Sequence, residues 1–322
     1  MAVIISIAGF AAAILVNLFI PQFADIAFKN YSVWGTGINA NNLYCCILLA
    51  LISVYAADGA ISIKNGGKRS AEYKKRAPLR FAAGIALALW DIAGTKLQLL
   101  PQPFFPGPAD IAGAFLEDGT YIWKNTFYSI RLFSVGFVSG TAAGIATGIL
   151  SGCFKKAAYW INPVLNICGV VPPVAWMPFA LILFPTSFQA AVFLLVICVW
   201  FPVASMTEQG ITSTPKSQFE AAKTLGASTR CQIFTVAVPH AMPQIFVGIT
   251  TAEAYAFMNL VMAEMLGQPG GLGYYINASK VWSAYYKIFA AIVVMAVLFS
   301  LIKFVIDKIG GYLLRWQKGI VK

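Results

Sequence analysis

The sequence predicts an all-α membrane protein, a polytopic helix bundle of about eight transmembrane helices. Of its 322 residues, 59% are hydrophobic and only 11% are charged, which leaves too little polar surface to cover a water-soluble globule. Apolar runs that approach the roughly 20 residues needed to cross about 30 Å of hydrocarbon recur along the whole chain. Charged residues lie between these runs rather than in one patch. We therefore expect a lipid-embedded chain without a large soluble domain, and no nucleic-acid partner despite a net charge of +11.

The apolar runs define eight expected spans. The first ten residues contain no Lys or Arg, so the first span lacks the basic start of a secretory signal and is expected to stay uncleaved. In the fifth span Pro172 and Pro173 remove two backbone donors in mid-membrane, so this span is expected to kink or unwind. The expected spans are Ala2–Ile20, Leu43–Ala57, Leu79–Leu99, Thr126–Gly152, Ile161–Phe184, Phe188–Met206, Met242–Leu266 and Ile288–Leu313.

One basic segment sets the expected orientation. Residues 64–80 hold seven Lys or Arg, whereas segments 21–42 and 101–125 hold one each. By the positive-inside rule the basic segment is cytoplasmic. Alternation of the spans then puts residues 155–156, segment 207–239 and both termini on the same side. We expect a multi-pass membrane protein with both termini in the cytoplasm.

The fourth span carries a glycine at every fourth position. This spacing leaves one helix face without side chains, so that another helix can approach closely. Two interpretations stay open: ordinary packing within the bundle, or a mobile interface such as one with a second copy of the chain. The glycines are Gly136, Gly140, Gly144, Gly148 and Gly152.

The segment from Ser213 to Pro239 is more polar than its flanks and predicts a helix-turn-helix at the cytoplasmic surface. Thr214 is expected to be the N-cap of a first helix with a proline at its first position, and Gly226 is expected to end it in a left-handed turn. A second helix should begin at position 228 or 229 and run until Pro239 ends it. Four apolar side chains here have no evident core, which predicts docking on a partner protein. They are Phe219, Leu225, Ile233 and Phe234.

The same segment resembles the EAA loop of permease subunits in binding-protein-dependent ABC importers. It shares Glu220-Ala221-Ala222, then Gly226, then Val236-Ala-Val238-Pro239, with Val at two positions where Ile and Leu are usual. Residues from about Leu79 onward are also similar to the nitrate/sulfonate/taurine branch of that family. The stretches that carry this similarity are Phe105-Pro-Gly-Pro108, Tyr128-Ser-Ile-Arg131, Pro172-Pro173, Ala263-Glu264-Met265-Leu266 and Gly270-Gly-Leu-Gly-Tyr274.

The resemblance implies a location in the bacterial cytoplasmic (inner) membrane, a function and partners. The chain would be the transmembrane permease of an ABC importer, would form the pathway for a small organic or inorganic anion or a related small solute, and would hold no cofactor. ATP and Mg would bind a separate cytoplasmic ABC ATPase; an extracytoplasmic solute-binding protein, the lipid membrane and a second permease copy in a homodimer would be the other partners. Residues 79–322 would be the permease core, preceded by additional N-terminal transmembrane helices and a basic cytoplasmic loop in residues 1–78. The implied ATPase-coupling residues are Glu220, Ala221, Ala222, Gly226, Ala227, Phe234 and Pro239.

Polar and helix-breaking residues inside the spans are the candidates for lining the solute pathway, because ionisable groups in hydrocarbon are costly and usually functional. Asp91 is a weaker candidate of this kind. Alternatives stay open for all of them. The proline-break residues could merely bend a packed helix. Glu264 could be hydrated at the outer interface or cap backbone donors, and Glu253 could pair with Arg131 or with a basic group on the ATPase side. The pathway candidates are Pro172, Pro173, Trp176, Glu253 and Glu264.

Catalytic and metal sites are not expected. A nucleotide-binding P-loop needs two glycines flanking four residues and then Lys and Ser or Thr; the nearest stretch, Gly66-Gly67-Lys68-Arg69, lacks both the spacing and the hydroxyl. The single histidine, His240, has no suggestive partner, and neither the internal repeat of a secondary transporter nor an acid-base set for an enzyme is evident. The cysteines are interpreted as small apolar side chains. They are Cys45, Cys46, Cys153, Cys168, Cys198 and Cys231.

Overall fold

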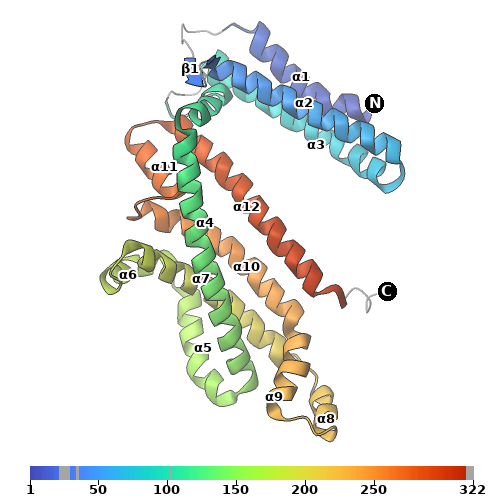
Figure 1. The fold of residues 1–322 in the computed structure, drawn as a ribbon, viewed down its shortest axis with the longest axis vertical. Helices are drawn as coiled ribbons and strands as arrows, with labels where there is room; N and C mark the ends of the chain where they lie inside the picture. Colours follow the sequence, from blue (N-terminus) through green and yellow to red (C-terminus); the bar gives the residue numbers. More distant parts are fainter. Residues whose placement is uncertain (22–29, 34–35, 100, 102, 317–322) are drawn as a thin grey trace. The chain divides into compact units, whose positions relative to one another are not determined.

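The computed structural model describes residues 1–21, 30–33, 36–99, 101 and 103–316 (Figure 1). The all-α prediction is confirmed; the described residues add one short antiparallel pair, β1 (Asn30–Val33) and β2 (Thr36–Asn39), in which Asn30 lies opposite Asn39. The helices are α1 (Ala2–Phe19), α2 (Ala40–Asn65), α3 (Gly67–Asp91), η1 (Ile92–Lys96), α4 (Pro108–Cys153), α5 (Lys155–Val170), η2 (Pro173–Trp176), α6 (Met177–Leu183), α7 (Ser187–Thr212), α8 (Lys216–Thr224), α9 (Thr229–Cys231), η3 (Gln232–Ala237), α10 (Val238–Met265), α11 (Leu272–Val281) and α12 (Tyr285–Leu313).

Seven helical segments in the described residues are long and apolar enough to cross a membrane, and an eighth span results if one bent helix pair is counted. This agrees with the predicted eight. The observed helix ends differ from the predicted span ends, because α2, α3 and α4 all extend well beyond the apolar runs. Residues 64–80 are helical on both sides of Gly66 rather than a loop, since Lys, Arg, Glu and Ala all favour helix. The segment expected to lie outside before the fourth span is likewise helical from Pro108 onward.

The bent pair lies where the sequence predicted a kinked or unwound helix. Helix α5 ends at Val170, and its axis makes an angle of 102° with the segment Pro173–Leu183. Val171 and Pro172 both adopt extended backbone, with ψ of 120° and 131°. A residue that precedes a proline is pushed out of the helical region, so two successive prolines force two extended residues and a sharp break.

The chain divides into two compact units. The first comprises Met1–Ile122 and Ala278–Val293, and the second comprises Trp123–Asn277 and Val294–Lys322. In the first unit α1 packs closely on α3 and on α2 (Figure 1). Gly9 and Gly84 lie where the backbones of α1 and α3 touch, and a β-carbon at either position would clash with the other helix.

In the second unit α4 packs along α7, and the glycine repeat forms this contact. A β-carbon added at Gly140, Gly144 or Gly152 would lie 2.7 Å from the β-carbon of a residue on α7, namely Val199, Val203 or Ile211. Gly136 and Gly148 meet Leu195 and Thr207 in the same way at 2.5 Å. The contacts therefore favour packing within the bundle over an interface with a second copy.

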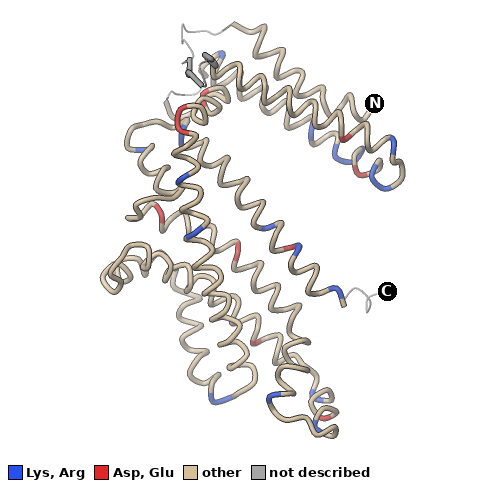
Figure 2. The backbone as a smooth tube through the Cα atoms, viewed as in Figure 1, with Lys and Arg blue, Asp and Glu red and all other residues tan. Residues whose placement is uncertain are grey.

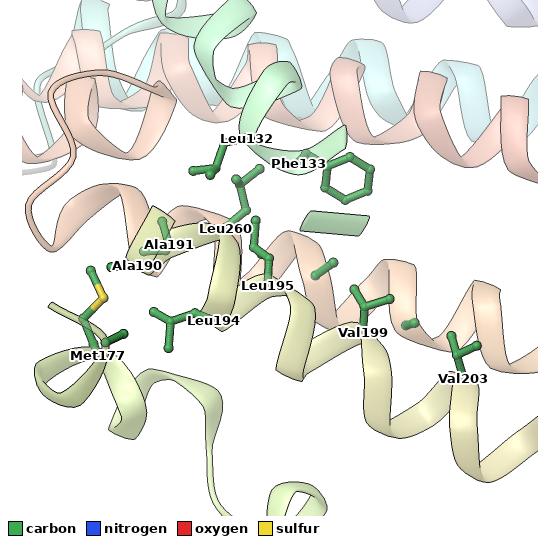
Figure 3. Packing of buried hydrophobic residues seen from close by; sticks show 14 residues of the cluster. Leu132, Phe133, Met177, Ala190, Ala191, Leu194, Leu195, Val199, Val203 and Leu260 are labelled. Atoms are coloured by element: carbon green, nitrogen blue, oxygen red, sulfur yellow. The ribbon is translucent and has the colours of Figure 1, made fainter. Parts of the chain in front are cut away.

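The core of the second unit lies where α4, α7 and α10 meet (Figure 3). Leu132 from α4, Leu195 from α7 and Leu260 from α10 are buried there, and Phe257 stacks on Phe299 of α12 with ring centroids 4.0 Å apart. Buried leucines and stacked aromatic rings of this kind hold helices in a fixed register.

Candidate functional site

The first helix of the expected coupling segment, α8, begins at Lys216. The prediction that Thr214 caps it is wrong: the N-cap is Pro215, and no side chain caps the helix. Pro215 has φ −59° and ψ 135°, so its backbone is extended and the helix can start only after it. Thr214 is buried, and its hydroxyl has no hydrogen-bond partner among the described residues.

The turn after α8 has the predicted left-handed glycine. Gly226 has φ +77°, and the Gly226 amide donates to the Lys223 carbonyl at 2.9 Å while the Ala227 amide donates to the Ala222 carbonyl at 3.0 Å. These two hydrogen bonds form a Schellman motif, which closes the C-terminus of a helix with its C′ residue in the left-handed region. The Gln232 side chain also donates to the Ala227 carbonyl at 2.8 Å, so both helices hold the turn.

The second helix begins as predicted, because the Ser228 hydroxyl accepts a hydrogen bond from the Cys231 amide at 3.4 Å. The expectation that Pro239 ends this helix is wrong. After α9 the chain forms a π-helical turn, η3, and continues into α10, with Pro239 in the first turn of α10. A missing N–H costs little in a first helical turn. The coupling segment is therefore joined directly to a transmembrane helix.

The exposed apolar surface of this segment is smaller than predicted. Phe219 packs against the buried cluster of Ile211, Ala237, Ala241 and Ile245, and Ile233 is half-buried. Leu225 and Phe234 remain 88% and 67% exposed. The other expected coupling residues divide between exposed and half-buried positions. Glu220, Ala221, Gly226 and Pro239 are exposed, and Ala222 and Ala227 are half-buried.

The proline break holds three of the expected pathway residues. Pro172 is exposed, whereas Pro173 and Trp176 are half-buried. The Trp176 ring packs against the main core, and its indole N–H is buried without a hydrogen-bond partner in the described residues. A buried donor without a partner is costly, which makes this ring a candidate to gain a polar contact in another state of the protein.

Glu253 lies on α10 and is only 2% exposed. Neither carboxylate oxygen has a hydrogen-bond partner within the described part of the chain. The pairing with Arg131 that was one alternative is not seen, since the Arg131 guanidinium instead lies 4.9 Å from the centroid of the Phe188 ring. Lys303 and Asp307 on α12 are the charged groups that act electrostatically on Glu253. A lone buried carboxylate is unusual in a packed helix bundle.

Glu264, the other acidic candidate, is 1% exposed. Its Oε2 atom has a hydrogen-bond partner, whereas Oε1 has none among the described residues. Its carboxylate accepts a hydrogen bond from the Gly273 amide at 2.8 Å, in the first turn of α11. Asn125 and Ser129 of α4 accept hydrogen bonds from the neighbouring amides of Gly271 and Leu272, both at 2.9 Å. These contacts favour the capping alternative, because a carboxylate at a helix N-terminus satisfies unpaired amides and the helix dipole.

Replacing Glu264 with Ala should destabilise the protein. The change leaves the Gly273 amide buried and unpaired, which costs about 1–3 kcal/mol, whereas Glu264→Gln keeps an acceptor oxygen and should cost less. Thermal unfolding of the purified protein in detergent measures both variants. Equal midpoints for Glu264→Ala and the wild type would contradict a capping role.

Asp91 belongs to a buried polar cluster that the sequence did not reveal. Asp91 is fully buried, and it accepts a hydrogen bond from the Asn17 side chain at 2.9 Å. That side chain also donates to Asn41, and Lys96 donates to the Asn17 backbone carbonyl at 2.7 Å. The cluster joins α1, α2 and the end of α3 within the first unit. Asp91 and Lys96 could be recognised in the sequence as ionisable residues. Nothing in the sequence separated Asn17 and Asn41, which join the cluster, from other polar residues.

The described residues contain no group of three His, Cys, Asp or Glu side chains that could hold a metal ion. All six cysteines are free thiols. Cys45 donates to Asn17, and the Asn259 side chain donates to Cys198. His240 is half-buried beside Pro239.

Comparison with known proteins agrees with this arrangement. Residues 140–319 match the family of binding-protein-dependent transport system inner membrane components. The putative aliphatic sulfonates transport permease protein SsuC of Bacillus subtilis is 29% identical over 236 residues, which cover 72% of this chain and 85% of that protein. The nitrate import permease protein NrtB of Synechococcus elongatus is 28% identical over 213 residues, covering 62% and 74%.

A solved structure shares the fold. A chain of the MetNI methionine ABC transporter in an inward-facing conformation superposes with a TM-score of 0.53 at 22% identity, covering 61% of this chain and 98% of that chain. The helix bundle and its EAA-like segment together place this chain in the class of membrane transport subunits. The chain belongs to the binding-protein-dependent transport system inner membrane component family, in its nitrate/sulfonate branch. It is the permease subunit of an ABC importer, in which a separate subunit hydrolyses ATP.

Proposed function

We propose that this permease works as a homodimer that imports a small anion and that α8 and α9 couple it to a cytoplasmic ATPase. The main support is the coupling segment: a rigid glycine turn presents the exposed Leu225 and Phe234, and its second helix continues into α10. A force on α9 would therefore reach a transmembrane helix directly. The names of the relatives refer to sulfonates and nitrate, which are anions, and we carry that substrate class over to this chain.

Copurification followed by transport tests the proposal. The permease should copurify with an ABC ATPase that binds Mg-ATP and should do so in two copies per complex. In proteoliposomes supplied with ATP and the extracytoplasmic binding protein, it should take up an anion from a panel of alkanesulfonates, nitrate and bicarbonate. Uptake that persists without ATP, or a complex with one permease copy, would contradict the proposal.

The division of the chain can be tested in the same assay. We propose that residues 79–322 form the permease core and that residues 1–78 are an addition to it. The helix α3 runs across this boundary, so the shortened chain should begin at Gly67 to keep α3 whole. It should still copurify with the ATPase, and a loss of binding would place part of the core in the first two helices.

We also propose that both termini and the coupling segment are cytoplasmic. In a cysteine-free background, single cysteines at Lys68, Lys156 and Lys223 should react with a membrane-impermeant maleimide only from the cytoplasmic side. Cysteines at Gly119 and Pro269 should react only from outside. Lys68, Lys156, Lys223 and Pro269 are exposed, and Gly119 is half-buried with nothing within 4 Å of an added β-carbon. Labelling of Lys68→Cys from the outer face would reverse the orientation.

Glu253 is proposed to contribute to the solute pathway. An unpaired buried carboxylate costs several kcal/mol, so its presence favours a second state in which water, solute or Lys303 contacts it. Replacing Glu253 with Gln removes the charge and keeps the shape. We expect an unchanged or higher thermal midpoint together with a transport rate altered at least several-fold.

A comparison variant is Asp307→Asn on α12, which removes one of the charges that act on Glu253 and leaves the Glu253 carboxylate in place. Asp307 pairs with Lys303 at 3.5 Å, and both side chains are more than half exposed. An exposed i,i+4 pair contributes at most about 0.5 kcal/mol, so this variant should have little effect on stability. A lower midpoint for Glu253→Gln would show that the carboxylate holds the folded protein together, and unchanged transport would exclude it from the pathway.

A further inference from the structure

The turn between α2 and α3 is a tight helical hairpin that carries a concentration of positive charge. Helix α2 ends at Asn65 and α3 begins at Gly67, with Gly66 and Gly67 at φ +57° and +58°. Glycine adopts this left-handed conformation readily, which allows the chain to reverse within two residues. Residues 58–80 contain seven Lys or Arg and two acidic residues, and Figure 2 shows these basic residues gathered around the turn.

Two of the basic residues already have partners within the hairpin. Asp58 on α2 pairs with Arg69 at 3.4 Å and with Arg80 at 3.1 Å. The Arg80 guanidinium also lies over the rings of Tyr55 and Tyr73, 4.8 Å and 4.3 Å from their centroids. These contacts tie α3 to α2 and fix the direction in which the remaining side chains point.

The other five basic side chains have no such role, and we call them the basic tip. All five are exposed, and the described part of the chain gives them no ion pair within 4.0 Å. One acidic residue, Glu72, remains near them to offset their charge. The basic tip comprises Lys64, Lys68, Lys74, Lys75 and Arg76.

Apolar side chains border the basic tip on both helices. Ile61 and Ile63 precede it on α2 and Leu79 follows it on α3, and all three are exposed. Exposed aliphatic residues on membrane-spanning helices face lipid chains. The basic tip therefore begins where the lipid-facing surface ends, at the depth of the phospholipid headgroups.

We propose that the basic tip binds the phosphate groups of anionic phospholipids at the membrane surface. Clusters of four to eight Lys or Arg beside a transmembrane helix attract acidic lipids, and the contributions of the individual side chains add. Ammonium groups on flexible stems can reach several headgroups, while the stems cover apolar surface. A soluble phosphate or an acidic protein would not need the bordering apolar residues.

The test measures lipid retention by the delipidated permease complex in detergent. Native mass spectrometry should show phosphatidylglycerol bound more tightly than phosphatidylcholine, and raised salt should weaken that preference. A variant with all five basic-tip residues changed to Gln should lose at least about tenfold in phosphatidylglycerol affinity. A variant with the four lysines changed to Arg keeps the charge and should bind like the wild type.

Matched controls separate the outcomes. Lys155→Gln with Lys156→Gln removes an exposed basic pair elsewhere and should leave phosphatidylglycerol affinity within about twofold of wild type. Equal retention of phosphatidylglycerol by the Gln variant, or no preference over phosphatidylcholine, would overturn the proposal. Competition by inorganic phosphate at concentrations equal to those of the lipid would assign the site to a soluble anion instead. Because the described residues give the five side chains no ion-pair partner, the Gln variant should keep the wild-type thermal midpoint in detergent. A lowered midpoint would show that these side chains stabilise the fold and would contradict the proposal.

Discussion

Gly226→Val should reduce ATPase binding and ATP-dependent transport about tenfold. Gly226 has φ +77°, and a β-carbon there would meet nothing within 4 Å. The cost of the substitution therefore comes from backbone conformation and not from steric crowding. It is roughly 1–2 kcal/mol for a residue with a β-carbon in the left-handed region and more for a β-branched residue. Relief of that strain would open the Schellman turn and move Leu225 relative to Phe234.

Two neighbouring variants make this prediction specific. Gly226→Asn should retain most activity, because Asn tolerates the left-handed conformation. Ala227→Val adds a β-branched side chain one residue later and should have a smaller effect. The measurements are the yield of ATPase copurified with the permease and the initial rate of uptake. Wild-type values for Gly226→Val would show that the turn does not position the coupling surface.

The coupling segment shows which local features a sequence can reveal. The left-handed Gly226 and the Ser228 cap were predictable, because each depends on a few residues and on backbone chemistry. Two other features could not be predicted: the start of α8 at Lys216, and the continuation of the helix past Pro239 into α10. Both depend on what surrounds the segment in the folded protein. Phe219 was expected on the surface for the same reason: its partners, Ile211 and Ala237, come from both sides of the loop.

The candidate pathway residues divide in a similar way. The break at Pro172 and Pro173 follows from proline geometry alone, and the structure confirms it. The partners of Glu264 could not be predicted, since Asn125 lies 139 residues earlier in the chain. The sequence did separate the two acids in part, because only Glu264 lies in a family-like stretch and only Glu264 was given the capping alternative. It did not show that Glu253 would have no hydrogen-bond partner in the described residues.

The glycine repeat illustrates the same limit and supports the strongest stability prediction. Spacing of four predicted a smooth face on α4, but the sequence did not identify the helix that covers it. The structure places α7 there, with each glycine of the repeat opposite a residue 59 positions later. This constant offset means that α4 and α7 keep one register over five contacts, so an added side chain cannot be accommodated by a small local shift.

Gly144→Leu should therefore disrupt the second unit. A β-carbon at Gly144 would already lie 2.7 Å from the Val203 β-carbon and 3.1 Å from the Trp200 carbonyl oxygen, and Val203 is fully buried. Overpacking of a core typically costs about 1–3 kcal/mol, and separation of the two helices would also remove the neighbouring contacts. We expect the thermal midpoint in detergent to fall by roughly 10 °C, with a lower yield of folded protein.

The matched control lies on the same helix. Gly119→Leu adds the same side chain to α4 at a half-buried position where a β-carbon meets nothing within 4 Å, so its midpoint should stay close to that of the wild type. Gly144→Ala should be intermediate, because one methyl group still requires Val203 to shift. A midpoint for Gly144→Leu that matches Gly119→Leu would mean that α4 and α7 do not pack closely in the protein. The glycine face would then be free to contact a second copy, which is the interpretation that the contacts now disfavour.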